Sequence, residues 1–121
     1  VSAGPDFNVY AYSVSDENLD MNPDAPPPWL VKTYKALGDD RRLRILRRLG
    51  DSDASLAELA KDSDIAKSTL HHHLMLLRAA GLIGVHIGDT KRYSVRRDTM
   101  TEAAASLKYY LEPNDDAKDD Q

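Results

Sequence analysis

One stretch, residues 56–80, constrains the fold of this 121-residue chain most strongly, because it contains two helical runs joined by a few polar residues. In the second run Leu70, Leu74 and Leu77 recur at the i, i+4 and i+7 spacing of a buried helical stripe. The opposite face opens with small polar, basic and imidazole side chains, which suit insertion of a helix into a DNA major groove. These residues predict a helix-turn-helix, with Asp64 at the tight-turn position where glycine is frequent.

Charge is distributed unevenly along the chain, whose formal net charge is −4. Residues 30–97 contain 14 Lys and Arg against 8 Asp and Glu, a balance of +6, whereas the remaining residues have a balance of −10. Attraction between exposed charges acts over about one Debye length, roughly 10 Å, so local charge decides it. The basic central region is therefore compatible with contacts to DNA phosphates.

Length and composition predict one small domain with tails. We expect a strand-like segment and a Pro-rich linker over residues 1–28, the domain over 29–111, and an acidic disordered tail over 112–121. No apolar run reaches the roughly 18 residues of a membrane span, and a chain without cysteine has neither disulfides nor thiolate metal sites. These features fit a cytoplasmic protein. Because the chain begins with Val1, we expect a processed product or a fragment of a longer protein.

Two further helices are predicted ahead of the helix-turn-helix. The first, residues 29–37, follows Pro28, which is suited to the first helical position. The second, residues 41–49, follows two aspartates, of which one is expected to cap it. Its expected inward-facing residues are Leu43, Leu46 and Leu49. Ser55 and Glu58 predict a capping box at the start of the helix-turn-helix.

After Gly81, which suits a left-handed helix cap, the apolar period changes from 3.6 to 2. The alternation on either side of residues 88–90 predicts a β-hairpin, and a hairpin directly after a recognition helix is a wing. The last helix, residues 99–111, has a broad apolar stripe that a small core cannot cover, so we expect it to pack with the first helix across a homodimer interface. The expected interface residues are Trp29, Tyr34, Met100, Ala103, Ala104, Leu107, Tyr110 and Leu111. The expected fold is thus mainly α (α+β), a winged helix-turn-helix of about five helices plus a two-stranded wing.

Candidate DNA contacts fall on three elements. The side chains expected to read base edges are Ser68, Thr69, His71 and His72. Those expected to contact phosphates are Lys67, Arg44, Lys91 and Arg92. For the basic side of the 41–49 helix, a solvated face is the alternative interpretation.

Two other functional classes are less well supported by the sequence. The consecutive histidines 71–73 do not predict a metal site, because neighbours on a helix lie about 100° apart and do not converge on one ion. No nucleophile with a positioned base, and no acid pair in a pocket, indicates an enzyme. A winged helix used only for protein–protein contact is the alternative function.

The runs KALGDDRRLRILRRL (35–49), STLHHHLMLLRAAGLI (68–83) and KRYSV (91–95) together resemble the ArsR-type winged helix-turn-helix regulators. The resemblance covers roughly residues 29–111 and implies a homodimeric bacterial or archaeal repressor that binds an operator. The recognition-helix positions of the family fall on Lys67, Ser68, Thr69, His71 and His72. Familiar metal-sensing sites of that family use cysteines in the third helix or a His/Asp/Glu set on the last helix. Here the third helix has no Cys and the last helix has no His. We therefore expect no metal and no cofactor. If the chain responds to a small molecule, which the sequence does not identify, we expect the binding site in an upstream region. The usual Ser before the recognition helix is Ala66, which costs a cap of about 1 kcal/mol.

Overall fold

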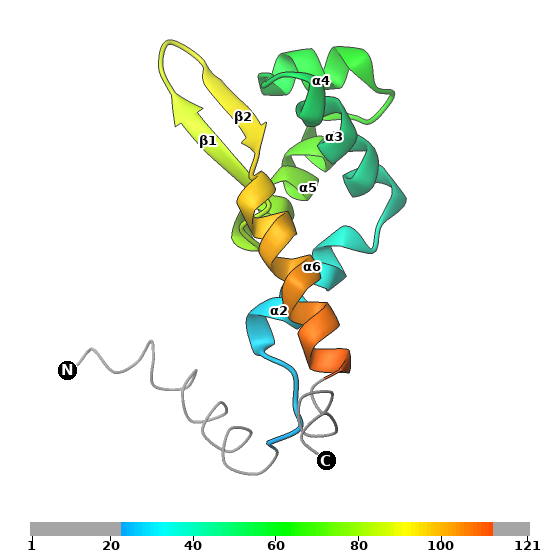
Figure 1. Ribbon diagram of the computed structural model, residues 1–121. Helices are drawn as coiled ribbons and strands as arrows, with labels where there is room; N and C mark the ends of the chain where they lie inside the picture. The colour runs from blue at the N-terminus through cyan, green and yellow to red at the C-terminus, as the bar shows by residue number, and fades with distance from the viewer. Residues whose placement is uncertain (1–22, 113–121) are drawn as a thin grey trace, which may run out of the picture.

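The computed structural model describes residues 23–112, and the following bounds refer to them (Figure 1). The helices are α2 (Pro28–Leu37), α3 (Asp40–Asp51), α4 (Leu56–Asp62), α5 (Lys67–Ala79) and α6 (Arg97–Leu111), and the strands are β1 (Ile83–Ile87) and β2 (Lys91–Val95). The predicted mainly helical winged helix-turn-helix is confirmed. The strand expected within residues 1–14 and the tail beyond residue 112 lie outside the described residues. None of the described helices has the length and apolar character needed to cross a membrane.

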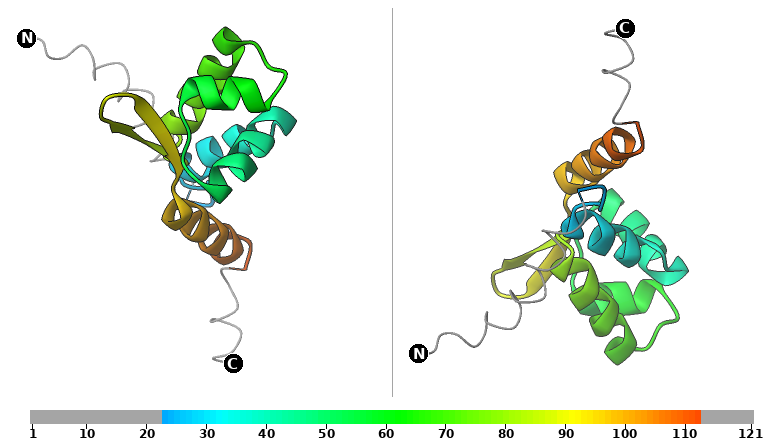
Figure 2. Two further views of the ribbon diagram at one scale, coloured as in Figure 1. Left: turned by 90° about the horizontal axis from the view of Figure 1, so that it is seen from above. Right: turned by 90° about the horizontal axis from the view of Figure 1, so that it is seen from below.

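The core is built around the leucine stripe of α5. Leu70, Leu74 and Leu77 are fully buried, as the sequence predicted, and they pack with residues from α3, α4 and the hairpin. This common core holds the two helices of the helix-turn-helix together. The hairpin projects to one side of the helical body, and α2 lies at the opposite end from α4 (Figures 1 and 2). Helix α5, the predicted recognition helix, lies in the body between these ends and is held there by the common core (Figure 1).

The expectation for α3 was wrong at one position. Leu43 is 49% exposed, and Ile45 is buried with Leu46 and Leu49. At about 100° per residue, Leu43 lies roughly 110° from the centre of the stripe that these three residues form. Arg42 instead lies near the centre of that stripe, three residues before Ile45, and its Nε donates to the Ala36 carbonyl oxygen at 2.7 Å.

The expected helix boundaries have the predicted chemistry. Pro28 is the first residue of α2, and the carboxylate of Asp39 accepts from the Arg41 and Arg42 backbone N–H groups at the start of α3. Both bonds of the Ser55–Glu58 capping box are present at the start of α4. Gly81 has a φ of +77°, the left-handed conformation that ends α5 and turns the chain into β1.

The hairpin pairs Ile83 with Val95 and Ile87 with Lys91, so its tip is residues 88–90 as predicted. A short bridge adds the segment before α4 to the outer edge of β2. Ala54 and Tyr93 exchange backbone hydrogen bonds, with N···O distances of 3.0 Å and 2.7 Å. Because Ala54 leads directly into the capping box, this bridge connects the wing to the helix-turn-helix.

A buried histidine lies where α2, α3 and α5 meet. His73 is 4% exposed, and the Arg42 Nη1 donates to its Nδ1 at 3.2 Å. An arginine cannot accept, so Nδ1 is the unprotonated nitrogen and Nε2 bears the hydrogen. The buried Nε2 has no hydrogen-bond partner among the described residues. Burial lowers the pKa of His73; Asp39 opposes that shift, and Arg41 and Arg42 add to it.

We expect the free energy of unfolding to fall as the pH drops below about 6.5, the pKa of an unfolded histidine. The native state keeps His73 neutral while the unfolded chain takes up a proton, so acid favours unfolding until the pH passes below the lowered native pKa. Urea denaturation of the wild type and of His73→Gln between pH 7.5 and 5.0 measures this. The variant should lose less stability with acid, and parallel pH profiles would remove His73 as the cause.

Candidate nucleic-acid interface

The exposed face of α5 brings together the predicted base-reading residues. Lys67, Ser68, His71 and His72 are exposed, and Thr69 is partly exposed. Ser68 and His72 lie opposite the buried leucines, and Lys67, Thr69 and His71 flank them. The same periodicity that anchors α5 therefore presents these side chains to solvent. No side chain caps the helix at Ala66, and the first N–H groups of α5 keep their partial positive charge.

The predicted phosphate ligand Arg44 lies beside the start of α5. A cavity of about 310 Å³ between α3 and α5 is lined by Arg41, Arg44, Asp64, Ile65, Ala66 and Thr69. Arg44 is exposed and donates through Nη2 to Asp40, its i−4 neighbour. Such a pair on a helix surface is weak, a few tenths of a kcal/mol, so Arg44 can exchange Asp40 for another anion. Arg41 also lines this cavity, although local sequence does not distinguish it from the other arginines of α3.

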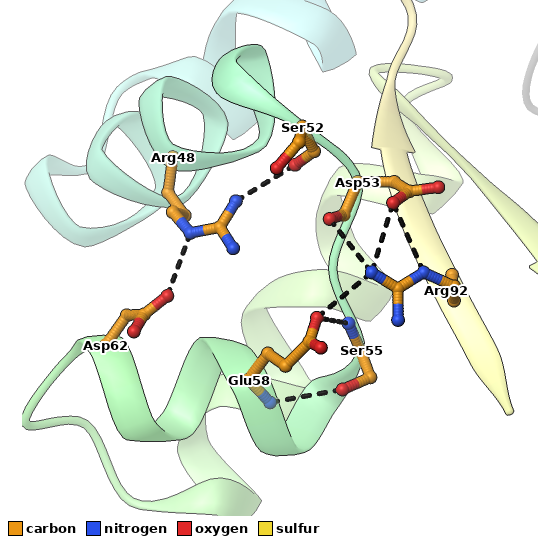
Figure 3. Close-up of polar contacts among 7 residues, drawn as sticks. All are labelled: Arg48, Ser52, Asp53, Ser55, Glu58, Asp62 and Arg92. Carbon is orange, nitrogen blue, oxygen red and sulfur yellow. Dashed lines mark hydrogen bonds and ion pairs between the residues drawn. The ribbon is translucent and has the colours of Figure 1, made fainter.

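The two predicted wing residues have different surroundings. Lys91 is exposed at the start of β2, beside the tip. Arg92 is only partly exposed, and it forms ion pairs at 3.1 Å with Asp53 and with Glu58 (Figure 3). The sequence-based role of Arg92 as a phosphate ligand overlooked these partners, because they lie 39 and 34 residues away along the chain.

Arg48, another arginine on the basic side of α3, also has local partners. Its Nε donates to Asp62 at the end of α4, and its Nη1 donates to the Ser52 carbonyl oxygen, both at 2.9 Å (Figure 3). The arginines on the basic side of α3 therefore differ in their surroundings. Arg44 faces the start of α5, whereas Arg48 joins α3 to α4.

The contacts of Arg92 affect the ionisation of its neighbours. The pKa of Glu58 lies below its usual value, first because its carboxylate accepts from the Ser55 backbone N–H and second because of Arg92. Hydrogen bonds to Asp53 and then to Glu58 raise the pKa of Arg92 above its ordinary value. The lowered pKa of Glu58 and the raised pKa of Arg92 keep both groups charged at neutral pH, as their ion pair requires.

The expected interface residues on α2 and α6 occupy three environments. Trp29, Ala104 and Leu111 are exposed, and Tyr34, Met100, Leu107 and Tyr110 are partly exposed. Ala103 is 1% exposed within the single chain, and its carbonyl oxygen accepts from the Tyr34 hydroxyl at 3.1 Å. An apolar cavity of about 410 Å³ lies between the two helices. Val31 and Tyr109, which were not among the predicted interface residues, are also exposed and extend this apolar surface.

The histidine run does not gather in one place. His73 points into the core, whereas His71 and His72 are exposed. Within residues 23–112, no three His, Asp or Glu side chains are arranged to share a metal ion.

Comparisons with known proteins point to regulators of transcription. A family model described as a helix-turn-helix domain matches residues 37–86. The transcriptional activator HlyU of Vibrio cholerae serotype O1 is 41% identical over 81 residues, which cover 67% of this chain and 75% of HlyU. The uncharacterized HTH-type transcriptional regulator YceK of Bacillus subtilis is 34% identical over 73 residues, 58% of this chain and 73% of YceK. A solved ArsR-like transcriptional regulator from Rhodococcus sp. RHA1 superposes with a TM-score of 0.67 at 28% identity, over 74% of this chain and 85% of that chain.

Proposed function

Because the chain belongs to the ArsR-type winged helix-turn-helix regulators, we propose that it is a homodimeric repressor that binds an inverted-repeat operator. That it is a DNA-binding regulator of transcription follows from the family and the helix-turn-helix. The two-fold symmetry of a dimer would place its half-sites about one helical turn apart, roughly 10 base pairs.

The observation that carries the proposal is the exposed, uncapped start of α5. In our proposal Ser68, Thr69, His71 and His72 read base edges in the major groove. Lys67 and Arg44 contact the flanking phosphates, and Lys91 contacts them from the wing. Because α5 is fixed by its buried leucines, its exposed face would enter the groove without rearrangement of the core.

The proposed dimer uses the α2 and α6 surface. Trp29, Leu107 and Leu111 offer apolar area at the end of the molecule opposite the wing tip and α4 (Figure 1). Pairing two copies there would cover that area and leave both recognition helices exposed. Ala103 would support the interface from within its own chain, since it is already buried.

The direction of regulation is the finer part of the proposal. A dimer on an operator that overlaps a promoter would block polymerase, which is the basis for proposing repression in the bacterial or archaeal cytoplasm. The relative HlyU is named an activator, so transcription from a promoter containing the selected operator must be measured with and without the protein.

The first experiment is selection from random-sequence duplex DNA, followed by titration at two salt concentrations, with the mass of the complex determined by sedimentation. We expect enrichment of an inverted repeat, one dimer per site, and affinity that falls steeply with salt. The slope reports how many phosphate contacts form.

Failure to bind at low salt, by a protein shown to be a dimer, would reject the DNA-binding role. It would favour the alternative function of a winged helix that contacts only other proteins. Binding without any enriched sequence would reject base reading by α5 while keeping the phosphate contacts.

A further inference from the structure

We infer that Arg92 is a positioning residue that holds the wing against the helix-turn-helix, rather than a phosphate ligand. It would do so by bridging Asp53 and Glu58. This inference rests on the proposed DNA binding only for its effect on affinity, because the attachment of the wing itself can be measured in the free protein.

The geometry of the Arg92 bridge gives the first argument. From β2, Arg92 donates through Nε and Nη2 to Asp53 Oδ1, at 3.2 Å and 3.1 Å, and through Nη2 to the Asp53 carbonyl oxygen at 3.2 Å. The same Nη2 donates to Glu58 Oε1 at 3.1 Å. Figure 3 shows the guanidinium lying between the loop before α4 and the first turn of α4. One cation therefore joins β2 to two adjacent parts of the chain, the loop before α4 and the first turn of α4.

Charge gives the second argument. One guanidinium between two carboxylates leaves a local charge of −1, which does not attract phosphate. The neighbouring Lys91 is exposed and forms no ion pair with any residue of the described range 23–112, so it has the available charge that a phosphate would require. The sequence places the two cations side by side, but the structure gives them different surroundings.

The position of the bridge gives the third argument. The Ala54–Tyr93 backbone bridge lies between Asp53 and the capping box, so the ion pairs and the backbone bonds close the same junction. At the other end of α4, Arg48 holds Asp62 (Figure 3). The first helix of the helix-turn-helix is thus attached at its start to the wing and at its end to α3. Loss of Arg92 would weaken the attachment of the wing, which the Ala54–Tyr93 bonds would still partly hold, and would leave the second attachment intact.

The first test is amide hydrogen exchange in the free protein. In Arg92→Gln, and in Asp53→Asn with Glu58→Gln, we expect the Ala54 and Tyr93 amides to exchange about two- to fivefold faster. Gln at position 58 can still accept from Ser55, so the capping box is retained. The Arg96 amide, which donates to the Leu82 carbonyl oxygen at the base of the hairpin, is the internal control and should be unchanged. Unchanged exchange at Ala54 and Tyr93 would overturn the inference, whatever the DNA result.

The second test uses DNA affinity and its salt dependence. If Arg92 positions the wing, Arg92→Gln should weaken binding about three- to tenfold while leaving the salt slope unchanged. Asp53→Asn should weaken binding as well. The variant that combines Arg92→Gln with Asp53→Asn should bind no more weakly than Arg92→Gln alone, because both changes break the same bridge. Lys91→Gln is the matched control, and it should lower the salt slope by about 0.9 per subunit.

The two roles predict opposite results. If Arg92 were a phosphate ligand, its loss would lower the salt slope as Lys91→Gln does, and removal of the Asp53 charge would tighten binding. Arg92→Lys separates them again, because lysine keeps the charge but cannot hold the carboxylates in a planar fork. A lysine variant that binds like the wild type would overturn the positioning role. Failure of the wild type to bind any DNA would instead reject the proposed function, and hydrogen exchange would still decide the attachment of the wing.

Discussion

Replacement of Lys67 and Lys91 by glutamate is expected to lower DNA affinity by at least about 100-fold at low salt. Each reversal removes a charge-assisted contact, worth about 1.5–3 kcal/mol, and adds repulsion against the same phosphate, and each change occurs in both subunits of a dimer. Both side chains are exposed, so the fold should tolerate the changes. Titration of the selected duplex over a range of salt concentrations measures the affinity and the slope together.

The matched control reverses Lys32 and Lys108, which are exposed on α2 and α6. Because these helices also carry the proposed dimer surface, sedimentation must first show that both double variants remain dimers. It changes the net charge by the same amount at the end of the molecule opposite α4 (Figure 1). If long-range attraction alone governed binding, the two double variants would be equally weak. Equal affinities would therefore contradict the assignment of Lys67 and Lys91 as contacts, whereas a large difference confined to the first variant supports it.

Local patterns explain why so much of the fold could be predicted. The stripe of Leu70, Leu74 and Leu77, the Ser55–Glu58 capping box and the Gly81 cap each depend on residues within about two helical turns. The hairpin likewise follows from alternation on both sides of a short polar tip. Where the spacing fits two faces, local information fails, as for α3, whose register was decided by packing.

In the candidate site, too, the features that depend on nearby residues could be predicted, and those that depend on distant residues could not. The exposed residues of α5 follow from the face opposite the leucines, and the Arg44–Asp40 pair follows from i, i+4 spacing. The partners of Arg92 could not be predicted, because Asp53 and Glu58 meet it only after the loop before α4 has paired with β2. The inward position of Arg42 likewise depends on the acceptor at Ala36.

Truncation of Leu77 to alanine is expected to have the largest effect on stability. Leu77 is 0% exposed in the common core of α5, α3 and the hairpin, so its loss removes apolar burial and leaves a cavity. Such Leu→Ala changes cost about 2–5 kcal/mol, a large fraction of the roughly 5–15 kcal/mol that stabilises a small domain. Urea denaturation followed by circular dichroism gives the free energy of unfolding.

Leu76→Ala makes the identical chemical change one residue earlier, where the side chain is 38% exposed. Alanine also favours a helix slightly more than leucine, which offsets part of the lost burial. We therefore expect this control to cost less than about 1 kcal/mol. Similar losses for both variants would mean that α5 is not anchored by the stripe, and the face assigned to DNA would lose its physical basis. A large loss at Leu77 alone fixes the orientation of α5, and with it the exposure of Ser68, His71 and His72.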